Sequence, residues 1–204
     1  MTSTIIPGLL QLKGYEKLQV IDVGCARGSF LRELFNIVSD EIVTSIGIDP
    51  LLDGDGLHTK YIKACVDNVS SPKKVRILTT GDDQASTICT PKYDGFKDGG
   101  QEVDVLNLND IILEEMPEGQ IHFLKIDAEG KDYSILESLT DETLDRILFI
   151  AVECINGDTR FKEEKNKIEV IEYLGSKGFS VFYSHDTNNG SGISDVIFRT
   201  TKDL

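Results

Sequence analysis

Apolar residues follow two alternating patterns along the chain, short continuous runs and stripes with helical spacing. The runs predict strands at residues 18–23, 42–49, 61–66, 121–127 and 146–153. The stripes predict helices and comprise Phe30, Leu34 and Val38; Tyr133, Leu136 and Leu139; and, within residues 162–176, Ile168, Ile171 and Leu174. Strands that alternate with helices indicate an α/β fold whose parallel sheet is covered on both faces.

The end of the chain departs from this alternation. Runs at residues 179–184 and 194–200 predict two strands joined by a turn-rich segment at 187–192, so the last strand is expected to run antiparallel. We therefore expect a doubly wound, mostly parallel sheet with an antiparallel last strand and helices on both faces. The length of 204 residues suits one well-filled core better than two, which predicts a single domain over residues 1–204.

The middle of the chain carries a weaker pattern. Residues 74–79 and 102–108 alternate between apolar and polar side chains, which predicts a hairpin inserted beside the main sheet. The residues between them, 80–101, are rich in Gly, Asp, Thr and Pro, and we interpret them as a long loop.

Acidic residues end four of the predicted strands: Asp22, Asp49, Asp127 and Glu153. In a doubly wound sheet the ligand lies beyond the carboxyl ends of the strands, where the strand order reverses. We therefore expect these four acids to surround one crevice. The alternative is that each acid only caps a turn.

The segment VIDVGCARGSF, residues 20–30, passes from a predicted strand through a glycine turn into a predicted helix. Asp49 follows Gly24 by 25 positions, close to the spacing at which such sheets place an acid on ribose hydroxyls, so an adenosine ligand is indicated. The glycine spacing differs from the G-x-G-x-x-G turn that approaches a dinucleotide pyrophosphate. S-adenosylmethionine has no pyrophosphate, and its sulfonium cation would suit a neighbouring acid such as Asp22.

Composition excludes several other classes of function. The chain has 35 acidic and 21 basic residues, a formal charge of -14, which opposes binding to a nucleic-acid backbone. It contains no Walker-type segment, no secretory signal pattern and no apolar run of the roughly 18 residues that a membrane span needs. Four cysteines without C-x-x-C or zinc-like spacing are typical of reduced thiols in a cytoplasmic protein.

Several motifs, taken in order, resemble one family. They are VIDVGCARGSF, SIGIDP, KACVDN, VDVLNLNDII, LKIDAEGKDYSILESL and VEC, between residues 20 and 154. They are similar to the FkbM-type S-adenosylmethionine-dependent methyltransferases, which are Rossmann-like, and the KIDAEG stretch is the most specific. The chain departs from the family pattern at Cys25 and Ala26, where Ala and Asn are usual, and at Asp132, where Glu is usual.

The resemblance implies S-adenosylmethionine as the cofactor and a set of residues that bind it. These are Asp22, Gly24, Cys25, Ala26 and Gly28 in the glycine loop, Asp49 on the ribose, and Asp67 beside the adenine. It also implies a hydroxyl acceptor on a sugar, a glycan or a natural-product-like molecule.

Such an acceptor loses a proton as it is methylated, which requires a general base. The candidates for this catalytic role are Asp127, Glu129 and Glu153, with His185 as a further possibility and Lys125 as a charge partner. A divalent metal could be held by Asp127 and Glu153, but two acids are too few to predict a metal site. The alternatives are a nicotinamide-dependent oxidoreductase, which the glycine spacing disfavours, and a catalytically silent domain that retains the cofactor pocket.

Overall fold

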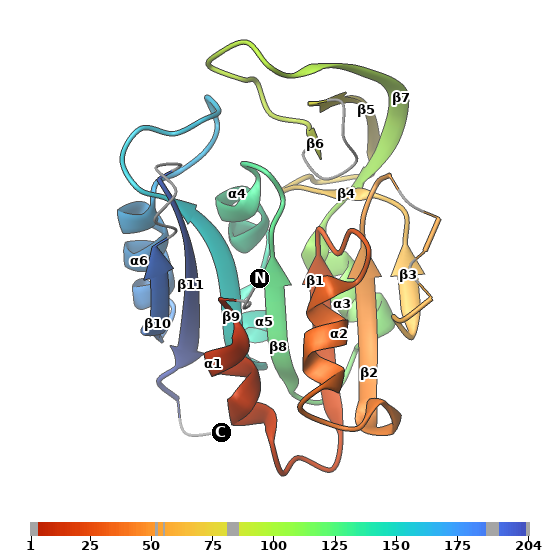
Figure 1. Cartoon of the computed structure of the whole chain (residues 1–204), viewed down its shortest axis with the longest axis vertical. Coiled ribbons are helices and arrows are strands. Elements are labelled where there is room, and N and C mark those ends of the chain that lie inside the picture. The colour runs from red at the N-terminus through yellow and green to blue at the C-terminus, as the bar shows by residue number, and fades with distance from the viewer. Residues whose placement is uncertain (1–3, 52, 55, 81–85, 187–191, 203–204) are drawn as a thin grey trace.

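The main sheet is the scaffold of the protein. The computed structural model describes residues 4–51, 53–54, 56–80, 86–186 and 192–202, and in them the strand order is β10-β11-β9-β8-β1-β2-β3 (Figure 1). The strands are β1 Leu18–Val23, β2 Val43–Ile48, β3 Lys60–Ile62, β8 Ile121–Ile126, β9 Ile147–Ile155, β10 Phe179–Asp186 and β11 Ile193–Thr200. Strands β1, β2, β3, β8 and β9 are parallel, and β11 is antiparallel to both of its neighbours. The predicted mostly parallel sheet with an antiparallel last strand is confirmed.

Helices cover both faces of this sheet, as predicted for a doubly wound fold. The short elements α1 Ile6–Leu9 and η1 Leu10–Leu12, together with α2 Ser29–Phe35, pack on one face around Phe30 and Phe123. On the other face, a second core is built with α3 Leu108–Glu115, α4 Asp132–Glu137, α5 Asp141–Asp145 and α6 Lys167–Ser176 (Figure 1). A single 3-10 turn, η2 Asp40–Ile42, leads into β2.

Two of the predicted helices are shorter than expected. Helix α2 ends at Phe35, before Val38. Helix α6 begins at Lys167 because Asn166 and Glu169 form a capping box there, five residues after the predicted start at 162. The predicted apolar face of α6 is wrong at Ile168, which is 66% exposed, because Val170 and Leu174 are the side chains that pack on the sheet.

A second, smaller sheet lies over the carboxyl ends of the main strands, at the top of Figure 1. Its order is β4-β7-β5-β6, with β4 Cys65–Val66, β5 Lys73–Thr79, β6 Ser86–Thr87 and β7 Lys97–Leu106. Strands β5 and β7 pair antiparallel, which confirms the inserted hairpin.

Two predictions in this region are wrong. The predicted strand 61–66 is split, because the chain leaves β2 after Ile62, and Cys65 and Val66 pair with β7 instead. The predicted loop 80–101 contains β6 and the first half of β7; its residues 81–85, like most of the predicted turn at 187–192, lie outside the described residues.

None of the helices in the described part of the chain has the length and apolarity needed to cross a bilayer. Cys25, Cys65, Cys89 and Cys154 are all free thiols.

Candidate active site

A cavity opens beyond the carboxyl ends of β1, β2 and β8 and contains about 690 Å³ of empty space, including its mouth. This is the point where the strand order reverses, since β1 lies between β2 and β8. Gly24, Ala26, Asp49 and Pro50 line one part of the cavity, and residues 127–129 with Lys131 line another. The lining is completed by Val23, by residues 64–66 and by residues 86–88, which include β6.

The glycine loop is in direct contact with the turn after β8. Gly24 has a φ of +72°, and a Cβ atom built on it would lie 1.8 Å from the carbonyl oxygen of Asp127. The loop is anchored to β2, because the backbone N–H groups of Gly24 and Cys25 both donate to the Ile48 carbonyl, at 2.9 and 3.2 Å. Gly28, with a φ of +74°, precedes α2 as its N-cap. Only glycine fits at Gly24, because any side chain would meet backbone.

Asp49 ties the end of β2 to the same loop. Its Oδ2 accepts a hydrogen bond from the Ala26 N–H at 3.0 Å, and its Oδ1 accepts one from the Leu51 N–H at 2.9 Å. Ala26 adopts a positive φ of 43°, a conformation that alanine rarely takes. The carboxylate of Asp49 therefore holds the loop in shape and lies at the cavity wall.

Asp22 is buried beneath the cavity and is not among the residues that line it. Its Oδ1 lies 3.2 Å from Lys125 Nζ, and its Oδ2 lies 3.6 Å from His58 Nε2. Burial raises the pKa of the Asp22 carboxyl, and the charge of Lys125 opposes that rise. The predicted contact of Asp22 with the cationic end of the cofactor stays a prediction, since the carboxylate is paired with Lys125 and does not line the cavity.

Lys125 is shared between two acids. It also lies 3.2 Å from Asp127, whose side chain is 43% exposed and lines the cavity. Burial disfavours the charge on Lys125, but Asp127 and Asp22 outweigh burial and hold the lysine pKa above its ordinary range. The predicted pairing of Lys125 with an acid of the crevice is thus present in the structure.

Asp67 follows β4 and lies behind Lys131 rather than in the cavity lining. Its Oδ2 is 3.1 Å from Lys131 Nζ, and its Oδ1 accepts a hydrogen bond from the Ser134 hydroxyl. Burial alone would raise the pKa of Asp67, but Ser134 and Lys131 lower it below its ordinary value. Lys131 is the side chain from this pair that reaches the cavity.

The other acids of the predicted site meet at a residue that the sequence did not indicate. Arg160 Nη1 lies 3.2 Å from Glu129 Oε2, and Arg160 Nη2 lies 2.8 Å from Glu153 Oε2. Glu129 lines the cavity with a positive φ of 46°, whereas Glu153 does not line it. Arg160 lies between β9 and α6, in a segment without helix or strand pattern, so neither spacing nor periodicity could have pointed to it.

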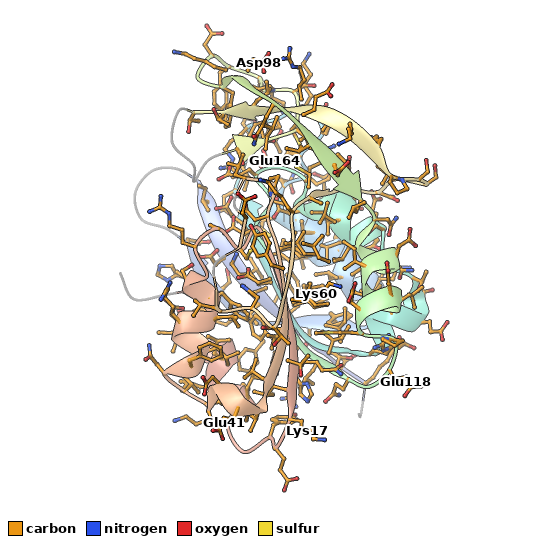
Figure 2. The ribbon with its side chains drawn as sticks, turned by 90° about the vertical axis from the view of Figure 1, so that its right-hand side faces the viewer. Lys17, Glu41, Lys60, Asp98, Glu118 and Glu164 are labelled. Atoms are coloured by element: carbon orange, nitrogen blue, oxygen red, sulfur yellow. The ribbon has the colours of Figure 1, made fainter. Side chains whose placement is uncertain are left out.

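Segments from the small sheet complete this side of the cavity. The Thr87 hydroxyl donates to the Glu129 carbonyl at 2.7 Å, and the Lys92 N–H donates to the Arg160 carbonyl at 3.0 Å. In Figure 2, Glu164 lies at the same end of the molecule as Asp98 of the small sheet, while Glu118 lies at the opposite end. The small sheet thus lines this side of the cavity, and the segment after β9 contacts the cavity residue Glu129 through Arg160.

The family of the chain follows from its match to a family profile. The profile described as the Methyltransferase FkbM domain matches residues 22–181. The chain belongs to this family. The match spans every residue that lines the cavity, and it also includes Arg160.

Solved structures share the fold of this FkbM methyltransferase domain. Methyltransferase FkbM from Methylobacillus flagellatus is 12% identical, with a TM-score of 0.58 over 92% of this chain and 45% of its own. A putative rRNA methylase from Clostridium thermocellum is 14% identical, with a TM-score of 0.51 over 100% and 99%. Magnesium protoporphyrin IX methyltransferase from Synechocystis, with bound SAM, is 12% identical, with a TM-score of 0.51 over 97% and 76%. No curated protein matches the chain in sequence.

Neither His185 nor a cluster of metal ligands belongs to this site in the part of the chain that the structure describes. His185 lies in the edge strand β10, three strands from β8, and does not line the cavity. Within the residues described here, no group of three or more His, Cys, Asp or Glu side chains is arranged to hold a metal ion.

Burial makes three acids at this edge of the sheet, Glu129, Asp132 and Glu153, hard to ionise. Burial raises the pKa of Glu129 to about 7 and that of Asp132 to about 6. Burial also raises the pKa of Glu153 well above its ordinary value, and the neighbouring Asp127 adds to the rise. A carboxyl with a pKa near 7 can take up a proton at neutral pH, as a general base must.

We expect Glu129→Gln to stabilise the protein in a pH-dependent way. An acid whose folded-state pKa is raised destabilises the fold as pH rises from its unfolded pKa to its folded pKa. Near pH 3 Glu129 is largely protonated in both the folded and the unfolded state, so the variant should match the wild type. At pH 8 it should be more stable by about 1–3 kcal/mol, in urea unfolding. A difference that is equal at the two pH values would contradict the raised pKa.

Proposed function

We propose that the protein transfers a methyl group from S-adenosylmethionine to a hydroxyl oxygen on a sugar, glycan or natural-product-like acceptor, with Glu129 as general base. The observation that carries the proposal is that the glycine loop and Asp49 share one cavity with Asp127 and Glu129. The resemblance to FkbM-type enzymes supports the hydroxyl acceptor, and the formal charge of -14 opposes a nucleic-acid acceptor.

The residues of the cavity fit S-adenosylmethionine. Asp49 stands at the end of β2, the position from which an acid binds ribose hydroxyls in such sheets. Pro50, Val66 and Ile88 offer apolar contacts for an adenine ring. Asp127 supplies a partly exposed carboxylate for a cationic group at the cavity wall.

The chain's own groups then have separate roles in catalysis. S-adenosylmethionine, when bound, supplies an electrophilic methyl group that the acceptor oxygen attacks in line. Because alignment lowers the barrier of such a transfer, the rigid contact of Gly24 with the turn at Asp127 favours it. Glu129 accepts the proton of the acceptor hydroxyl, while Lys125 holds the Asp127 side chain at the cavity wall through their 3.2 Å contact. Glu153 contacts Arg160 and does not line the cavity, so we assign it no proton transfer.

Two other functions are distinguished by binding. A nicotinamide-dependent oxidoreductase would bind NAD, and the family match disfavours it. A catalytically silent domain would bind S-adenosylhomocysteine without methylating any member of a hydroxyl-acceptor panel. The position of Glu129 at the cavity wall, together with its raised pKa, favours the enzyme, since perturbed acids in a cleft cluster at functional sites.

Calorimetry with S-adenosylhomocysteine tests the proposal. We expect the wild type to bind it and not NAD, and we expect Asp49→Ala to weaken binding by about 1–3 kcal/mol, because ribose hydrogen bonds to a charged group are lost. Asp49 also accepts the Ala26 N–H, so the unfolding free energy of the variant should be measured in parallel.

Asp53→Ala is the matched control, since Asp53 is an exposed acid in the same connection after β2. The Asp53→Ala variant should bind S-adenosylhomocysteine with the same affinity as the wild type. Wild-type protein that binds no S-adenosylhomocysteine would overturn the proposed function, and equal affinity in wild type and Asp49→Ala would overturn the role of Asp49.

A further inference from the structure

Arg160 brings three carboxylates together beside the cavity. Its guanidinium contacts Glu129 and Glu153, as described above, and Nη2 also lies 3.3 Å from Glu164 Oε1. All four side chains are at most 20% exposed. One positive charge thus faces three acids, and a planar guanidinium is the side chain that can contact several carboxylates in a fixed geometry.

The position of Arg160 is fixed from both sides of its backbone. Its N–H and the Phe161 N–H both donate to Glu164 Oε2, so Glu164 holds the backbone and the guanidinium at once. Its carbonyl accepts the Lys92 N–H from the small-sheet side. The neighbouring Phe161 ring is fully buried and covers Gly130, where a Cβ atom would lie 2.3 Å from the ring. The guanidinium is therefore presented rigidly to the turn that carries Glu129.

We propose that Arg160 is a positioning residue for Glu129: it holds that carboxylate at the cavity wall and, by dividing its charge among Glu129, Glu153 and Glu164, sets the pH at which Glu129 accepts a proton. The inference deepens the proposed function and rests on it for its catalytic meaning. Arg160 does not line the cavity, so it acts through Glu129 and not on the acceptor.

The charges around Glu129 agree with this role. The groups that act on it are Arg160 and Glu164 from the segment after β9, Asp127 from its own turn, Asp132 from α4, and Tyr93 from the segment after β6. Burial and the acids favour the protonated form, and Arg160 opposes them. Without Arg160, nothing in this set favours the carboxylate, so Glu129 would be protonated at neutral pH and unable to act as a base.

Glu153 is given a role by the same geometry. It is the closest carboxylate to the guanidinium, at 2.8 Å, yet it does not line the cavity. Since an opposite charge that is shared stabilises each partner less, Glu153 limits how strongly Arg160 can lower the proton affinity of Glu129. It is a partner of Arg160 and not a base.

The test is a carboxyl titration by NMR on full-length protein with ¹³C-labelled glutamate, which needs no acceptor. The Glu129 signal is identified by its absence in Glu129→Gln. We expect Arg160→Gln to raise the proton affinity of Glu129 by about tenfold or more, because an adjacent cation lowers a carboxyl pKa by about 1–3 units. Arg160→Lys keeps the charge but cannot contact all three acids, so its increase should be smaller, about threefold.

Arg146→Gln is the control for nonspecific destabilisation. Arg146 lies at the opposite end of β9, where its guanidinium donates to the carbonyls of Met116 and Gly119, and its loss should leave the Glu129 titration unchanged. Arg160→Lys also serves if Arg160→Gln does not fold. An unchanged Glu129 titration in a folded Arg160 variant overturns the inference. Failure of the wild type to bind S-adenosylhomocysteine overturns only the proposed function, because the titration does not depend on it.

Discussion

Gly24→Ala is expected to destabilise the protein by about 2–4 kcal/mol and to remove detectable binding of S-adenosylhomocysteine, because a methyl group forced into a packed site and a positive φ each carry a cost. The new Cβ would lie 1.8 Å from the Asp127 carbonyl oxygen, and backbone cannot move aside as a flexible side chain can. The glycine loop and the turn after β8 would therefore separate. Urea unfolding measures the first effect and calorimetry the second.

The control for this variant is Gly14→Ala. Gly14 also has a positive φ, of 94°, but nothing lies within 4 Å of a Cβ atom built on it. The Gly14→Ala variant should lose about 1–2 kcal/mol of unfolding free energy, because alanine disfavours a positive φ. It should still bind S-adenosylhomocysteine. If the two variants behaved alike, the contact between Gly24 and Asp127 would not be what holds the two turns together.

The second large effect is expected for Lys125→Met, which should destabilise the protein by about 3–5 kcal/mol, the usual cost of breaking a buried ion pair from one side. Methionine replaces the stem of the lysine but leaves Asp22, which is 1% exposed, without its nearest cation. It also releases Asp127 at the cavity wall. Urea unfolding at two pH values is the measurement.

The pH dependence of Lys125→Met follows from Asp22. Burial already raises the pKa of Asp22, and without Lys125 it rises further. An acid with a raised folded-state pKa does not lower the free energy of unfolding below its ordinary pKa. It lowers that free energy by the full amount above its folded-state pKa. The defect should thus be larger at pH 8 than at pH 5. Adding Asp22→Asn should recover most of the loss at pH 8; a defect that neither pH nor Asp22→Asn changes would mean that Lys125 acts by packing alone.

The central strands of the main sheet, β1, β8 and β9, could be predicted because they are buried on both faces. Strand β1 has the predicted bounds, and β8 and β9 differ from theirs by one or two residues, since continuous apolar runs identify such strands. The small sheet was harder to predict. The first half of β7, from Lys97, is exposed and pairs with β5 through its backbone, so it has no apolar pattern. Likewise the move of the chain from β3 to β4 leaves no mark in the apolar run at 61–66.

The candidate site was predictable where it depends on strand ends. Asp49, Asp127 and Glu129 reach the cavity because parallel strands bring their carboxyl ends to one edge. Asp22 and Glu153 also lie at that edge, yet their side chains pair with Lys125 and Arg160 instead. The alternation of side chains along a strand cannot say which acid meets a cation from another segment. Arg160 itself depends on Glu164, Phe161 and the Lys92 N–H, which are contacts of tertiary structure.

The pairing of the segment after β6 with the segment after β9 has a consequence for protein engineering. Residues 87–92 and 159–163 are about 70 positions apart, yet they exchange backbone hydrogen bonds at Thr90 with Lys162 and at Lys92 with Arg160, and Glu163 binds Thr90. If only one of these segments were replaced by that of a relative, its backbone and side chains would not match the segment that it contacts. When loops are exchanged between members of this family, both segments should therefore be replaced together.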